Sequence, residues 1–129
     1  MKPYKVLYVL LFILGYSCAH DSAEPFVTCN PPDTVSFSTD ILPILNAECN
    51  TSGCHSGTLP GVNLNLEPCH AFTELMKPGS GYIDTVNPKY SVLYAQMNST
   101  SYPMPPTGKL DKCRIDLVLK WIRQKAKNN

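Results

Sequence analysis

The sequence predicts a small all-α domain with three to five helices joined by long loops. Its last helix is the clearest, because Ile115, Val118, Leu119 and Ile122 recur at the spacing of one helix face. Stretches rich in Pro and Gly separate the helical patterns, and no series of alternating strands is evident. A chain of 129 residues makes one domain. So few helices cannot be stable through aliphatic packing alone, and we expect something further to fill the middle.

The first helix is expected to begin after Asp40 and to end near Glu48. Apolar residues recur three and four positions after Ile41, which is the spacing of one helix face. Asp40 is the expected N-cap, because Pro43 then falls within the first turn, where its missing N–H is tolerated.

Two shorter helices are expected over residues 71–76 and 91–97. The final helix should begin after Asp111, whose side chain suits an N-cap. Leu110 before this cap and Ile115 after it occupy the positions of a hydrophobic staple. Basic residues in the last turns suit the negative end of the helix dipole.

The chain begins with a targeting segment. Residues 1–17 have the layout of a secretory signal peptide, with two lysines, the apolar run 6–14 and small residues after it. Cys18 follows directly, and the segment resembles a bacterial lipoprotein signal in which Cys18 becomes the lipid-modified first residue. We expect an extracytoplasmic protein that is lipid-anchored to a bacterial membrane, on its periplasmic or outer-membrane side; an ordinary cleaved signal peptide is the alternative. A polar tether over residues 18–35 then leads to the domain, residues 36–129.

The net charge and the length of the apolar runs exclude some classes of protein. A net charge of +1 excludes a nucleic-acid binder that works by bulk electrostatics. No apolar run reaches the roughly 18 to 20 residues that a multi-span membrane protein needs. From Lys109 onward there are seven basic and two acidic residues, whereas residues 18–108 hold two basic and eight acidic ones. This asymmetry indicates either a solvated helix face or a surface that docks an acidic partner.

The most informative motif follows the first predicted helix. Four residues separate Cys49 from Cys54, and His55 comes directly after the second cysteine. Haem c is attached through two thiols, with a histidine beside the second, usually as C-x-x-C-H. Here the spacing is C-x4-C-H, and the small residues at 51–53 allow the two additional residues to bulge out. Three other interpretations stay open: a local disulfide, half of a zinc site, or separate pairing with other cysteines.

Met104 is the candidate for a second ligand to a haem iron. It lies in the segment Tyr-Pro-Met-Pro-Pro, just ahead of the last helix. A thioether opposite a histidine favours ferrous iron, and flanking prolines leave the methionine few backbone states to lose. Simple packing of Met104 is the alternative, and Met97 is the next candidate ligand.

Taken together, residues 36–129 resemble the small monohaem c-type cytochrome domain found in lipoproteins and larger secreted proteins of Bacteroidetes and Planctomycetes. The resemblance implies a cytochrome c-like fold around one covalent haem c. It implies that Cys49 and Cys54 hold this haem, that His55 is the proximal ligand and that Met104 is the distal ligand. The segments that carry the resemblance are residues 36–37, 40–45, 49–55, 61–64, 91–94, 104–106, 115 and 121–122.

The resemblance also implies contacts outside the motif. Trp121 is expected to pack in the last helix against the first. A disulfide between Cys29 and Cys113 is expected, because members of this group carry cysteines just before the domain and at the start of the last helix. A bond between Cys69 and Cys113 is the alternative.

The expected function is electron transfer between redox proteins, as a monomeric carrier held at the membrane by its lipid. With both axial positions of the iron filled, the protein would not be an enzyme. Two alternatives are kept. One is a haem enzyme or a sensor of gas or peroxide with an open iron position, and the other is a non-haem interaction lipoprotein stapled by disulfides.

Overall fold

Helices and loops make up the part of the chain that the structure, a computed structural model, describes: residues 29–57 and 63–129. No strand occurs within these ranges, so the prediction of an all-α domain is confirmed. The expected signal peptide, Cys18 and most of the tether lie outside the described residues. The elements are a π-helical turn η1 (Phe37–Ile41), α1 (Leu42–Glu48), α2 (Ala71–Leu75), a 3-10 turn η2 (Pro88–Tyr90), α3 (Val92–Asn98) and α4 (Lys112–Arg123). Among the described helices, none has the length and apolar character that crossing a membrane requires.

The first helix begins four residues earlier than predicted, so Asp40 is not its N-cap. Ser36 is the N-cap, and its Oγ accepts a hydrogen bond from the backbone N–H of Thr39 at 3.4 Å. The Asp40 carboxylate reaches back and accepts the N–H of Ser36 at 2.7 Å. This reciprocal pair works as a capping box does, but with the acid four residues after the cap instead of three.

Pro43 accounts for the π-helical geometry of η1. A proline inside a helix removes one N–H donor, and its ring collides with the carbonyl four residues before it. Here the turn ahead of Pro43 is wider: the N–H of Ile41 bonds the carbonyl of Ser36 at 3.3 Å, and the N–H of Leu42 bonds that of Phe37. The chain therefore passes Pro43 without leaving the helix.

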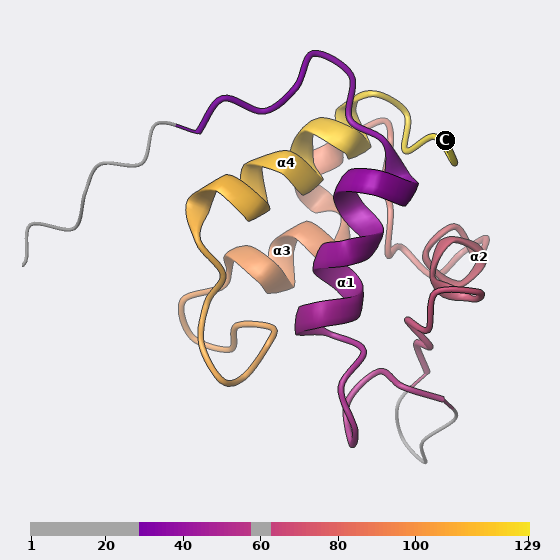
Figure 1. The fold of residues 1–129 in the computed structure, drawn as a ribbon, viewed down its shortest axis with the longest axis vertical. Helices are drawn as coiled ribbons and strands as arrows, with labels where there is room; N and C mark the ends of the chain where they lie inside the picture. Colours follow the sequence, from indigo (N-terminus) through magenta and orange to yellow (C-terminus); the bar gives the residue numbers. More distant parts are fainter. Residues whose placement is uncertain (1–28, 58–62) are drawn as a thin grey trace, which may run out of the picture.

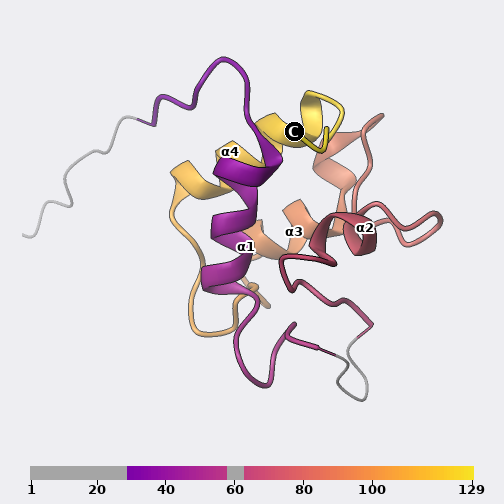
Figure 2. The ribbon, with the colours of Figure 1, turned by 45° about the vertical axis from the view of Figure 1, so that its right-hand side comes forward.

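Trp121 of α4 lies at the centre of the core and has no exposed surface. Its ring centroid is 5.3 Å from that of Phe37 in η1, and Phe37 in turn makes an edge contact with Phe72 of α2 at 5.1 Å. The indole Nε1–H donates to the carbonyl of Lys127 at 2.9 Å, so its polar atom is satisfied. Figures 1 and 2 both show α4 crossing the upper part of the helix that η1 and α1 form. The expected packing of Trp121 against the start of the first helix is therefore present.

The other predictions for α4 are confirmed. Asp111 is its N-cap, and Asp111 Oδ1 accepts the backbone N–H of Arg114 at 3.0 Å. Leu110 and Ile115 are both buried, as a hydrophobic staple requires. The predicted apolar face is buried along its whole length, at Ile115, Val118, Leu119 and Ile122.

A disulfide joins the segment before η1 to the first turn of α4. Cys29 and Cys113 are bonded, with their Cα atoms 5.1 Å apart. The pairing is the one expected, and the alternative partner, Cys69, is an exposed free thiol. The bond spans a sequence separation of 84 residues. Closing a loop of this length in the unfolded chain is worth about 4 to 5 kcal/mol in the chain-entropy model.

The residues between this disulfide and η1 lie against the far end of α4. Val35 is buried in the core, at 2% exposure, and its N–H donates to Gln124 Oε1 at 2.9 Å. Gln124 Nε2 donates to the carbonyl of Asp33 at 2.6 Å. One side chain at the end of α4 thus fixes the direction in which the chain enters η1.

α4 ends in a Schellman motif without a glycine. The N–H of Ala126 bonds the carbonyl of Trp121, and the N–H of Lys125 bonds that of Ile122, both at 3.0 Å. Lys125 occupies the position that normally favours glycine, and its φ is +72°. Its Nζ donates to the carbonyl of Thr85 at 3.1 Å.

The substitution Lys125→Gly is therefore expected to stabilise the protein. Glycine adopts this left-handed conformation without the steric cost of a Cβ, which is about 1 kcal/mol. Lys125→Ala is the matched control, because it removes the contact with Thr85 but keeps the Cβ. Urea unfolding should give a free energy of unfolding about 1 kcal/mol higher for the glycine variant than for the alanine variant. Equal stabilities would contradict this account of the helix end.

Candidate functional site

A cavity of about 540 Å³ lies between the loop that follows α1 and the wall formed by α3 and the loop after it. This volume falls within the roughly 300 to 1,000 Å³ typical of sites for small molecules and cofactors. Most of the lining is apolar. It comprises Cys49, Gly53, Cys54, Leu64, Leu66, Val92, Leu93, Met97, Met104, Pro105 and Pro106, with Glu48, His55, Asn63, Tyr82 and Gln96 as the polar members.

The loop from Cys49 to His55 carries the predicted motif along one wall of this cavity. Cys49 is the C-cap of α1, so the helix end fixes the position of the first thiol. The N–H of His55 bonds back to the carbonyl of Cys49 at 3.1 Å and closes the loop. Inside it, the N–H of Cys54 bonds the carbonyl of Thr51 at 3.0 Å, and Gly53 has a φ of +81°. A tight turn thus absorbs the two residues by which this motif exceeds C-x-x-C-H.

The imidazole of His55 is oriented by the segment Leu64–Leu66. Its Nδ1 lies 3.0 Å from the carbonyl oxygen of Leu64, and its own carbonyl accepts the N–H of Leu66 at 2.8 Å. A carbonyl can only accept, so Nδ1 carries a proton, and in the neutral imidazole the lone pair is then on Nε2. A histidine held in this way offers Nε2 as a metal ligand. The Leu64 contact could not be predicted from the sequence, because a backbone carbonyl leaves no residue signature.

Cys49 and Cys54 are both free thiols, so the interpretation of this pair as a local disulfide does not hold for the structure. Cys49 is 8% exposed, whereas Cys54 is half-buried. Burial and, to a smaller extent, the neighbouring Glu48 and Cys54 together raise the pKa of the Cys49 thiol to about 11. Cys49 is therefore held in its protonated form at neutral pH.

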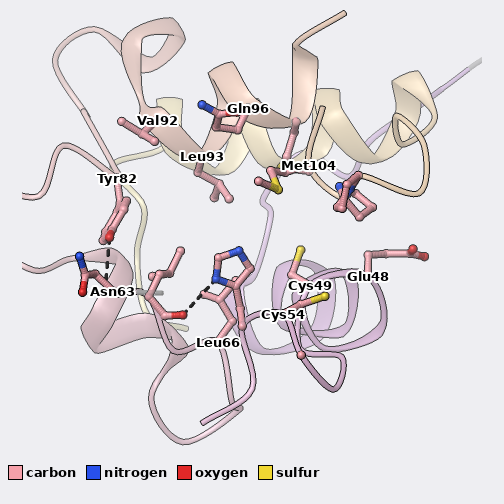
Figure 3. Close-up of a pocket in the computed structure, with 16 residues that line it drawn as sticks. Glu48, Cys49, Cys54, Asn63, Leu66, Tyr82, Val92, Leu93, Gln96 and Met104 are labelled. Carbon is pink, nitrogen blue, oxygen red and sulfur yellow. Dashed lines mark hydrogen bonds between the residues drawn. The ribbon is translucent and has the colours of Figure 1, made fainter. Parts of the chain in front are cut away.

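Met104 lies on the wall that faces these cysteines. Figure 3 shows Cys49 and Cys54 on one side of the cavity and the sulfur of Met104 directed into it from the other. The N–H of Met104 bonds the carbonyl of Gln96 at 3.1 Å and ties this loop to α3. Met97 of α3 also lines the cavity, but it is buried at 1% exposure, whereas Met104 is 43% exposed. Both methionines named from the sequence thus reach the same cavity.

The donor set of the cavity fits a haem c. It combines two reduced thiols, an imidazole with a free Nε2, and thioether sulfur on the facing wall, within mostly apolar surroundings. Over residues 29–57 and 63–129, no three His, Cys, Asp or Glu side chains are grouped as they would be around a metal ion. The zinc interpretation of the motif thus finds no ligand set there.

Comparisons with models of protein families, with curated proteins and with solved structures give no match to this chain. The resemblance to c-type cytochromes stays a prediction that depends on the residues themselves.

Sequence reasoning did not find every residue that lines the cavity. Tyr82 and Asn63 lie together at the end away from the cysteines, and the Tyr82 hydroxyl donates to the Asn63 carbonyl at 3.4 Å (Figure 3). Glu48 lies at the cysteine end. Its position directly before Cys49 was the one available signal, and it is a weak one, because acidic residues are common in surface helices.

The raised pKa of Cys49 predicts slow alkylation of this thiol in protein made without haem attachment. Only the thiolate reacts, and at pH 8 about one Cys49 thiol in a thousand is ionised. Mass spectrometry after iodoacetamide treatment should show that Cys49 reacts much more slowly than the exposed Cys69, with a rate that rises as the pH approaches 11.

The same shift has a consequence for stability. The thiol of the unfolded chain ionises from about pH 9. The contribution of Cys49 to the free energy of unfolding is therefore fully present below that pH and is lost as the pH rises towards 11. Cys49→Ala should therefore flatten the alkaline loss of stability.

Alkylation of Cys49 and Cys69 at equal rates at pH 8 would contradict the buried position of Cys49.

Proposed function

We propose that this protein is an extracytoplasmic monohaem c-type cytochrome that carries electrons between redox proteins. The observation that supports it most is the arrangement of the cavity, in which two free thiols face the thioether of Met104 and His55 lines the same cavity. In this proposal Cys49 and Cys54 hold the haem through thioether bonds. His55, through Nε2, and Met104 would be the axial ligands.

A haem c supplies an iron that gains and loses one electron. The Leu64 carbonyl would hold the imidazole of His55 in one orientation as this happens, because it accepts the hydrogen bond from Nδ1. The buried side chains of Leu66 and Leu93 give the cavity apolar walls that limit the access of water. If His55 and Met104 both bound the iron, the chain would leave no position there for a substrate, which is why we propose a carrier and not an enzyme.

The cellular part of the proposal is based on the sequence alone. Lipid modification of Cys18 would hold the domain at a bacterial membrane, on the periplasmic or outer-membrane side. The tether over residues 18–35 would then raise the effective concentration of the domain around membrane-bound redox partners.

Covalent haem is the first thing to test. The full chain should be expressed in a bacterial host that attaches haem c, and its intact mass and reduced-minus-oxidised spectrum recorded. We expect a mass increase of one haem and a low-spin c-type spectrum. Cys49→Ala and Cys54→Ala should each remove one thioether bond and shift the absorbance bands of the reduced protein. A colourless protein whose mass includes no haem would refute the proposal and favour the non-haem lipoprotein.

The second test concerns the distal ligand. Met104→Ala should leave the haem attached, lower the reduction potential and allow the ferrous protein to bind carbon monoxide, because a vacant axial position replaces the thioether. Met97→Ala, on the same wall, is the matched control and should change the spectrum much less. Unchanged spectra for Met104→Ala would assign the ligand role to Met97. Ready binding of carbon monoxide by the unsubstituted protein would favour the enzyme or sensor alternative.

A further inference from the structure

An ion pair lies at the cysteine end of the cavity. Glu48 lines the cavity beside Cys49, and its Oε1 lies 2.5 Å from Nη1 of Arg114. The pair joins the last residue of α1 to the first turn of α4 across 66 residues of sequence. Figure 3 shows Glu48 at the same end as Cys49 and Cys54, with its carboxylate directed outward.

Arg114 is held in place by a second carboxylate. Its Nε lies 3.2 Å from Oδ2 of Asp111, the residue whose Oδ1 also caps α4. The side chain of Glu48 is 30% exposed and that of Arg114 is 46% exposed, so solvent partly screens the pair. Such a pair adds little to stability, about 0 to 1 kcal/mol. Glu48 nevertheless lines a largely apolar cavity, where a charge is less screened than on an open surface.

The charge of Glu48 is felt within the site. It is the second cause, after burial, of the raised pKa of the Cys49 thiol. A carboxylate in this position favours any state of the site that carries more positive charge, and the guanidinium of Arg114 opposes it. The net effect of the Glu48 and Arg114 charges therefore changes the free-energy difference between the oxidised and the reduced cofactor.

We propose that Arg114, through its ion pair with Glu48, is a positioning residue that sets the reduction potential of the cofactor in this cavity. The inference depends on the proposed function. Neutralising Arg114 leaves an unopposed carboxylate beside the cavity, which stabilises the ferric state and lowers the potential. Neutralising Glu48 leaves the guanidinium, which raises it.

The experiment measures the midpoint potential of the full chain, haem attached, with the substitutions Arg114→Gln, Glu48→Gln and both together. We expect a lower potential for Arg114→Gln, a higher one for Glu48→Gln, and a value near that of the unsubstituted protein for the double variant. Lys112→Gln is the matched control, because it removes the same charge from the same turn of α4, where Lys112 pairs with Asp116 instead of Glu48. Its shift should be smaller than that of Arg114→Gln. All shifts should shrink at high ionic strength.

The signs of the shifts separate this role from a merely structural one. Loosening of the contact between α1 and α4 would move both single variants in the same direction, and that result would overturn the inference. Equal shifts for Arg114→Gln and Lys112→Gln would also overturn it, because they would indicate only the net charge of the helix. If the unsubstituted chain carries no haem, the proposed function fails and this inference with it. If haem is attached and the opposite shifts are missing, the inference alone fails.

Discussion

Trp121 and Phe37 bring the two halves of the domain together. Trp121 is fully buried in α4, and its ring lies 5.3 Å from that of Phe37 in the turn that leads into α1. The loop that carries the cysteines begins where α1 ends, and Met104 follows α3, which packs on α4. One wall of the cavity therefore follows the turn that carries Phe37, and the other packs on the helix that carries Trp121. A change at Trp121 would act on the site through the spacing of its walls, although the indole does not line it.

The described core is divided into a packed side and a hollow side. Apolar side chains surround Trp121 on the packed side, and the cavity of about 540 Å³ occupies the other. A chain of 129 residues has limited apolar surface to bury, and a site of this volume takes up part of the interior. The disulfide between Cys29 and Cys113 and the side-chain bonds of Gln124 add stability on the packed side.

Local signals were sufficient to predict three of the helices closely. α2 and α3 lie within one residue of their predicted ranges, and α4 begins at the predicted residue, because apolar spacing and the Asp111 cap are local features. The start of the first helix was mistaken because the Ser36 cap pairs with Asp40 at an unusual spacing, and because a wide turn lets Pro43 lie further inside the helix than expected. The cavity residues named from the sequence do meet. The Leu64 carbonyl and the pair of Glu48 with Arg114 could not be predicted, because they depend on contacts that only the folded backbone creates.

The disulfide also determines how mechanical force would enter the domain. Any pull on the chain before Cys29 passes through the covalent bond into Cys113, at the first turn of α4. The hydrogen bonds that hold Val35 and Asp33 to Gln124 lie beyond this junction, so the covalent bond carries part of the load before it reaches them. A force on the segment before Cys29 would thus act directly on α4, and η1 and the loop of cysteines beyond it would be loaded less.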